Sequence, residues 1–275
     1  MAAFSQPGVI WPSITQNGKH EPFELQVGRG LITNHQPVEI FGYSTQIGGT
    51  ALGPLWEGLT QSGGTYAYPG SAIPLVLLSA SGATDAGLII QVNGLDANYN
   101  ILTEFATLNA SGTVTTTNSY FRINGLFITN GVNAGNITAK SAGGTLYAQI
   151  NAGVGQTQMS IYTVPNGYTF YLTYVQANAS IGFTSSNYMI YAEYNKFNLA
   201  NVIQENGYNY TVNGNTTLLS QSPFVQIFNI PYTVPVAHPS GTDLQLQMKS
   251  NTGGPFVGSI FAGGYLINNA TATTF

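Results

Sequence analysis

The feature that most constrains the fold is a succession of short β-type segments with almost no charge between them. Between residues 105 and 192 only Arg122 and Lys140 are charged. The segments are rich in β-branched and aromatic residues, which pack well on a pleated surface. Gly, Asn, Asp and Pro at 93–100 and at 165–167 supply the backbone angles of tight turns. This pattern predicts strands joined as hairpins at both places.

Candidate strands recur at spacings of about 8 to 12 residues, which is typical of sandwiches and barrels. They lie at 66–68, 73–79, 86–93, 100–108, 112–117, 119–129, 136–140, 145–150, 157–164, 168–178, 187–194, 199–204, 224–230, 243–249 and 257–267. No comparable helical periodicity is present. The sequence of 275 residues therefore predicts an all-β protein with one or two antiparallel β-sandwich domains. A jelly-roll-like arrangement is preferred and an Ig-like sandwich is the second choice.

The sequence suggests three regions. Residues 1–65 contain five prolines between short apolar pieces, and proline is excluded from helix interiors and central strands. We expect an extended N-terminal arm there, with short edge strands at 23–27 and 38–43. Residues 66–155 are predicted to form a first β-sandwich region, and 156–275 a second, jelly-roll-like sandwich.

Composition excludes several classes of function. Charged residues make up 6% of the chain, the net charge is −4, and there is no cysteine. Nucleic acid or an anionic membrane would require a basic patch, and disulfides or thiolate metal sites would require cysteine. No apolar run is long enough for a membrane helix, and the N-terminus does not resemble a signal peptide. We expect synthesis in a cytoplasm, followed by life inside an assembly, since few surface charges oppose self-association.

No constellation of residues indicates catalysis, a metal or a cofactor. The segment beginning at Asp96 has oxygen side chains at alternate positions but lacks the Gly and Glu of a calcium loop, so we interpret it as an Asx-stabilised turn. His238 and Asp243 have no nucleophile motif to complete a catalytic triad. Glu104 and Glu193 are the acids in or near apolar strands, and we expect each to face solvent rather than form a glycosidase pair.

Aromatic residues are the strongest candidates for an interface. Trp11 and Trp56 are the only tryptophans and, with Phe23, lie in the proline-rich arm. A tryptophan on irregular backbone needs a large apolar contact, in its own core or on a neighbouring subunit. A second group lies near Asn-rich loops and suits interface packing, sandwich packing or sugar binding. It consists of Tyr188, Tyr191, Tyr194, Tyr208 and Tyr210, and the first three are the candidate interface residues.

Several segments resemble a family of virion structural proteins from tailed bacteriophages, of the capsid decoration, cement or knob type. They are Gly94-Leu95-Asp96-Ala97-Asn98-Tyr99-Asn100, Thr115-Thr116-Thr117-Asn118-Ser119-Tyr120-Phe121-Arg122, Gln158-Met159-Ser160-Ile161-Tyr162-Thr163-Val164-Pro165-Asn166-Gly167-Tyr168 and Phe41-Gly42-Tyr43. The resemblance covers residues 23–178 and is weaker beyond. It implies a non-enzymatic, β-rich and trimeric component of the particle, and it carries over no functional residue.

The leading hypothesis is a protein that decorates a phage capsid and stabilises it by bridging shell subunits. Its partners would be the major capsid protein and further copies of itself, and its location the capsid surface of the virion. The first alternative is a tail or fibre component that binds host glycans through the Tyr/Asn-rich loops after Tyr188. The second alternative is a capsid shell protein.

Overall fold

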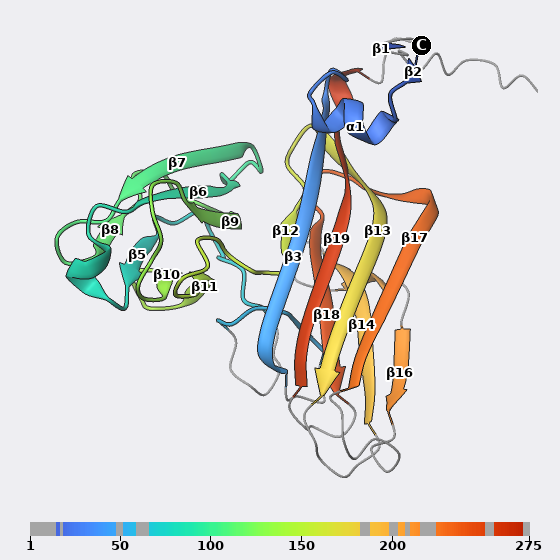
Figure 1. Cartoon of the computed structure of the whole chain (residues 1–275). Helices are drawn as coiled ribbons and strands as arrows, with labels where there is room; N and C mark the ends of the chain where they lie inside the picture. Colours follow the sequence, from blue (N-terminus) through green and yellow to red (C-terminus); the bar gives the residue numbers. More distant parts are fainter. Residues whose placement is uncertain are drawn as a thin grey trace, which may run out of the picture.

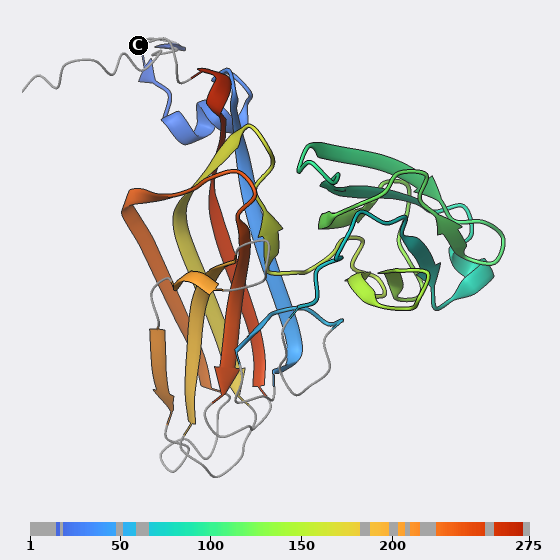
Figure 2. The same cartoon turned by 180° about the vertical axis from the view of Figure 1, so that it is seen from behind.

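The computed structural model of the chain describes residues 15–16, 19–47, 52–58, 66–181, 188–197, 203–206, 210–214, 224–250 and 256–271. Nearly all regular structure in these ranges is antiparallel β-sheet, which confirms the predicted all-β class. The strands form two units that lie side by side, a tall two-sheet sandwich and a smaller lobe (Figure 1). The view from behind shows the two polypeptide segments that connect them (Figure 2).

Two sheets form the tall sandwich. The first sheet has the order β17 (Phe224–His238), β13 (Tyr168–Ile181), β19 (Phe256–Asn268) and β3 (His35–Ile47). The second has the order β12 (Ile161–Thr163), β18 (Asp243–Ser250), β14 (Tyr188–Phe197) and β15 (Ile203–Asn206), with β16 (Tyr210–Gly214) also paired to β14 and β4 (Gly53–Pro54) paired to β18. A core that includes Ile40, Phe170, Leu246 and Ile260 fills the space between the sheets.

The order in which the chain visits these sheets is that of a jelly roll. β4 and β12 pair with the same edge of β18, at Gln247–Met248 and at 243–245, so they act as one interrupted strand. If β15 and β16 are also counted as one strand, the jelly roll has eight strands in chain order. Across the first sheet, from β3 to β17, the order is then first, eighth, third and sixth strand. The second sheet reads second, seventh, fourth and fifth. This alternation between two sheets is the double Greek key of a jelly roll, in agreement with the preferred arrangement.

The lobe is an insertion within the second strand of the jelly roll. The chain leaves that strand after Leu55 and rejoins it at Ser160, and these two residues are hydrogen-bonded, with Ser160 N donating to Leu55 O (3.0 Å) and Leu55 N to Ser160 Oγ (2.7 Å). Gly42 of β3 lies against this crossing point, since a Cβ there would lie 2.4 Å from Ser160 Cβ. Only glycine permits this close approach.

Two smaller sheets enclose the core of the lobe. One has the order β11 (Leu146–Ile150), β10 (Ile137–Lys140), β5 (Val76–Ser79) and β8 (Thr113–Thr115), and the other has β7 (Ile101–Thr107), β6 (Ile89–Leu95) and β9 (Arg122–Ile128). The β6–β7 pair is the predicted hairpin, with Ile89 opposite Thr107 and Leu95 opposite Ile101. The shorter elements are β1 (Thr15–Gln16), β2 (Lys19–His20) and the 3-10 turns Gly82–Asp85 and Asn269–Thr271.

Four local predictions are wrong. Residues 66–68, predicted as a strand, belong to no strand. Residues 23–27, predicted as a strand, belong to the helix α1 (Phe23–Gly28), which starts directly after Pro22 and has Glu24 in its first turn; both features favour a helix N-terminus. β3 is an edge strand, as predicted for 38–43, but it has 13 residues and is not short. The turn at 165–167 does not close a hairpin, because β12 and β13 lie in opposite sheets. The boundaries at residues 65 and 155 stay predictions.

Candidate functional site

The structure places two of the predicted interface aromatics. Trp56 is 3% exposed and its ring meets that of Tyr66 edge to face, at 5.7 Å, inside the lobe. It therefore belongs to the chain's own core, which was one of the two settings expected for it. Phe23 is half-buried at the start of α1, with its ring 5.3 Å from Tyr265 and 5.8 Å from His35.

The other predicted positions remain open. Trp11 lies outside the described residues. Tyr188, Tyr191 and Tyr194 lie on β14, which runs between β18 and the pair formed by β15 and β16; their backbone positions are described but their side chains are not. The predicted role of these four residues in an interface stays a prediction.

The candidate catalytic and metal-binding groups are engaged in structural bonds. Asp96 Oδ1 accepts hydrogen bonds from the backbone N–H groups of Asn98 (2.8 Å) and Asn100 (2.9 Å), the Asx turn that the sequence predicts. Glu104 accepts from Thr117 N (2.6 Å) and Asn118 N (2.9 Å). It therefore holds a turn and does not simply face solvent. Within the described ranges, no three His, Asp or Glu side chains lie close enough to share a metal ion.

A buried ion pair joins the lobe to the jelly roll. Arg122 of β9 and Asp243 of β18 are 3% and 1% exposed. Asp243 accepts from Arg122 Nε at 2.9 Å and from Nη2 at 3.0 Å, and also from Thr163 Oγ1 at 2.5 Å. The bidentate geometry uses the planar fork of the guanidinium. Burial by itself would lower the pKa of Arg122, but the hydrogen bonds and charge of Asp243 outweigh it and raise that pKa.

Aromatic rings surround this ion pair. The guanidinium carbon lies 4.2 Å from the ring centroid of Phe121, 4.5 Å from that of Tyr68 and 5.6 Å from that of Tyr99. Burial, and next the Asp243 carboxylate, raise the pKa of Tyr68 well above its ordinary value. Rings at these distances offer a cation partial compensation for lost water.

Further hydrogen bonds join the two units around the same point. The Asn124 side chain bonds both backbone groups of Thr163, with Nδ2 donating to the carbonyl and Oδ1 accepting from the N–H, each at 2.9 Å. Asn166 N donates to Tyr99 O at 2.7 Å, which ties the β12–β13 turn to the β6–β7 turn. We call this set of contacts, centred on Arg122 and Asp243, the junction.

The outer face of the first jelly-roll sheet carries a line of aromatic rings. Tyr174 and Phe261 are 5.5 Å apart, Phe261 and Phe41 are 6.5 Å apart, and all are half-buried. Tyr265 continues the line toward Phe23. The ring of Tyr174 covers Gly263, where a Cβ would lie 2.4 Å from it. Burial, and next Glu39, raise the pKa of Tyr174. We call these five rings the aromatic face; a solvated sheet face is normally polar.

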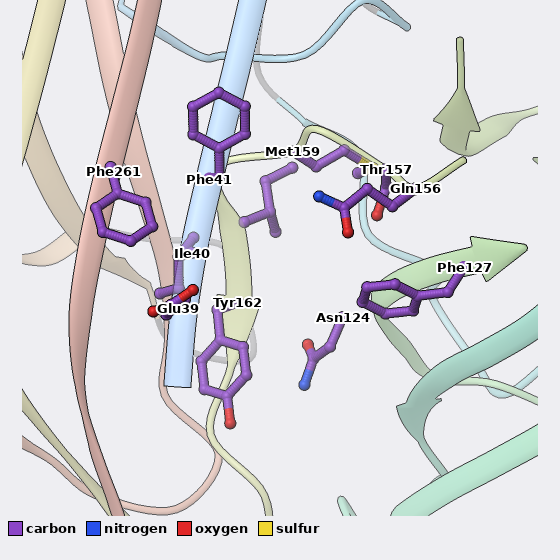
Figure 3. A pocket seen from close by; sticks show the side chains of 11 residues that line it. Glu39, Ile40, Phe41, Asn124, Phe127, Gln156, Thr157, Met159, Tyr162 and Phe261 are labelled. Atoms are coloured by element: carbon purple, nitrogen blue, oxygen red, sulfur yellow. The ribbon is translucent and has the colours of Figure 1, made fainter. Parts of the chain in front are cut away.

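A cleft of about 400 Å³ lies between the aromatic face and the lobe. Phe41 and Phe261 line it on the jelly-roll side, and Phe127 faces them from β9 (Figure 3). The other lining residues are Glu39, Ile40, Asn124, Gln156, Thr157, Met159, Ile161 and Tyr162. Within the described part of the chain, no hydrogen bond is formed by the side chains of Glu39 and Gln156.

The junction and the cleft had no clear signal in the sequence. Arg122 and Asp243 are 121 positions apart, and no local pattern near either residue specifies the other. Phe41 and Phe127 lie in the predicted strands 38–43 and 119–129, where aromatic residues are common, so neither stands out as a binding residue. A hint was the isolation of Arg122 in a charge-poor region, because a charge retained there needs a partner.

Comparisons with known proteins identify no family. No protein-family model and no curated protein sequence matches the chain. Among solved structures, the chain is similar to the VP2 subviral particle of infectious bursal disease virus, with 10% identity over 87% of this chain and 73% of that chain and a TM-score of 0.23. It is also similar to a structure of the Gt strain of that virus, with 9% identity over 90% and 87% of the two chains and a TM-score of 0.14. Such scores do not establish a common fold. None of the helices in the described ranges is long and apolar enough to cross a membrane.

Proposed function

We propose that the chain is a non-enzymatic structural protein of a viral particle, which decorates a capsid and stabilises it by bridging shell subunits. The aromatic face carries this proposal. Phe41, Tyr174, Phe261 and Tyr265 are half-buried on the outer face of a jelly-roll sheet, where polar side chains are normal. A contiguous apolar patch of this kind marks a surface that a neighbouring molecule covers.

The sheet geometry supports the same use. β3 is an edge strand of 13 residues that carries Phe41, so a subunit packed against this face also meets a long sheet edge. Half-buried rings contribute apolar area at a low cost in side-chain entropy, and tyrosines keep a hydroxyl for the wet rim of an interface. In this proposal the jelly roll contacts the major capsid protein and further copies of the chain, with trimers as the expected oligomer, and the lobe projects from the contact.

The test is rebinding to capsids from which the protein has been stripped. Recombinant chain should restore saturable decoration, counted against the major capsid protein by quantitative mass spectrometry. The double variant Tyr174→Ser/Tyr265→Ser should fold, because both rings are half-exposed, and should decorate poorly. Val132→Ser, at a position 70% exposed in the lobe, is the matched control. Full decoration by the double variant would refute the role of the aromatic face.

A second candidate is the capsid shell itself. The jelly-roll connectivity favours it, since viral capsid domains are one of the recurrent uses of that architecture. Electron microscopy of the purified recombinant chain separates the two, because a shell protein forms closed particles alone and a decoration protein does not.

A further inference from the structure

We infer that the cleft between the lobe and the jelly roll is a binding site for an uncharged oligosaccharide. It extends beyond the proposed structural role, because a subunit that only bridges shell proteins has no use for an open cleft on its own surface. Its volume of about 400 Å³ lies within the range of small-ligand sites, roughly 300–1,000 Å³.

Aromatic rings line the cleft from opposite sides. Phe41 and Phe261 belong to the jelly roll, and Phe127, which is 37% exposed, belongs to the lobe. In Figure 3 the ring of Phe127 extends from β9 toward the strand that carries Phe41. Ring faces placed in this way suit the C–H-rich faces of pyranose rings, which are apolar although the sugar edges are polar.

Polar groups with spare hydrogen-bonding capacity lie between these rings. In the described part of the chain, Glu39 and Gln156 spend no side-chain atom on internal hydrogen bonds. A carboxylate only accepts hydrogen bonds, whereas an amide both donates and accepts. Hydroxyl groups also do both, so a sugar can satisfy the two side chains together.

The charge of the lining selects among ligands. Glu39 is charged, and no Lys or Arg is among the lining residues. A phosphate, sulfate or sialic acid would therefore enter beside a carboxylate without a compensating cation. A peptide added as a strand could pair with the edge of β3 only up to residue 42, because Tyr43 N already donates to Gln158 O at 3.3 Å. An uncharged oligosaccharide meets neither obstacle.

The experiment measures binding of defined hexasaccharides to the full recombinant chain by saturation-transfer NMR and calorimetry. Chitohexaose, cellohexaose, maltohexaose and laminarihexaose are the uncharged probes, and a heparin hexasaccharide is the charged one. At least one uncharged probe should bind, and heparin should not. Failure of all four uncharged probes, or preference for heparin, would overturn the inference. Since no capsid is used, its failure is distinct from failure of the proposed function.

Matched variants locate the binding. Phe127 and Phe105 both lie directly opposite Gln91 in the sheet of the lobe, and both are exposed, but Phe105 does not line the cleft. Phe127→Ala should weaken binding about tenfold, and Phe105→Ala should leave it within about twofold. Gln156→Ala and Glu39→Gln, which change no core contact, should also weaken it. Equal losses in the two Phe variants would refute the cleft as the site.

Discussion

The junction can be tested by replacing the buried acid Asp243 with its uncharged isostere. In Asp243→Asn the side-chain shape is kept, but the charge that faces Arg122 is removed. The guanidinium then stays in a site where it is 3% exposed. It keeps the rings of Phe121 at 4.2 Å and Tyr68 at 4.5 Å and loses its anionic partner.

The expected cost follows from this geometry. Removal of one member of a buried ion pair typically costs about 3–5 kcal/mol, whereas a cation–π contact returns about 1–2 kcal/mol. The rings surround the guanidinium in the wild-type protein and in the variant, so they reduce the cost of the unpaired charge without cancelling it. We expect Asp243→Asn to lower the free energy of unfolding by about 3 kcal/mol. The melting temperature should fall by roughly 6–12 °C, at about 2–4 °C per kcal/mol for a chain of this size.

The assay is a double-mutant cycle in urea and by calorimetry. Arg122→Met removes the cation and keeps most of the side-chain volume, so the double variant contains no unpaired charge. It should be more stable than Asp243→Asn alone. A cost below about 1 kcal/mol for Asp243→Asn, the range of exposed pairs, would show that the pair is solvated. A double variant no more stable than Asp243→Asn would show that the unpaired guanidinium is not the source of the cost.

Two other residues give predictions for the lobe. Burial would raise the pKa of Asp85, but hydrogen bonds from Ser79, Ala134 and Gly135 lower it. Its contribution to stability is thus present above the unfolded pKa of about 3.9. This contribution is lost as the pH falls through the folded pKa. The urea concentration at the unfolding midpoint should therefore decrease as the pH is lowered below about 4, and it should decrease less steeply in Asp85→Asn. Trp56→Ala should cost about 3–5 kcal/mol as a core truncation, measured by urea unfolding; a stable variant that only fails to assemble would contradict burial of Trp56.

The strands could be predicted from the sequence because their signals are local. Alternation and β-branched content are properties of five to ten neighbouring residues, and β13, β18 and β19 lie at or close to the predicted ranges. The sequence does not predict the helix α1 although Pro22 and Glu24 mark its start, because the proline content of residues 1–65 argues against helices and a helix of two turns gives only a weak local signal. Helix propensity of single turns is a weak guide when tertiary contacts decide.

The arrangement of the strands could not be predicted because it depends on distant partners. β3 pairs with β19, with Phe41 opposite Phe261, and nothing near residue 41 specifies that partner. The insertion of the lobe after Leu55 also has no signal in the sequence. The strand that it interrupts consists of two residues before the lobe (β4) and three after it (β12). Such short fragments form only because β18 supplies the hydrogen bonds for both.

Phe41 and Phe261 belong both to the aromatic face and to the cleft, so the two proposals make demands on the same rings. A capsid subunit that covers Tyr174 and Tyr265 need not reach Phe127, which lies across the cleft on the lobe. The junction holds the lobe, and with it Phe127, across the cleft from the aromatic face. Asn124 of β9 contributes directly, because it lines the cleft and also bonds Thr163 of β12 at 2.9 Å. A ligand in the cleft therefore contacts both units at the point where they are joined. Because the sugar and the capsid subunit both use Phe41 and Phe261, we expect them to compete for these two rings, and the Tyr174/Tyr265 and Phe127 variants separate the two sites.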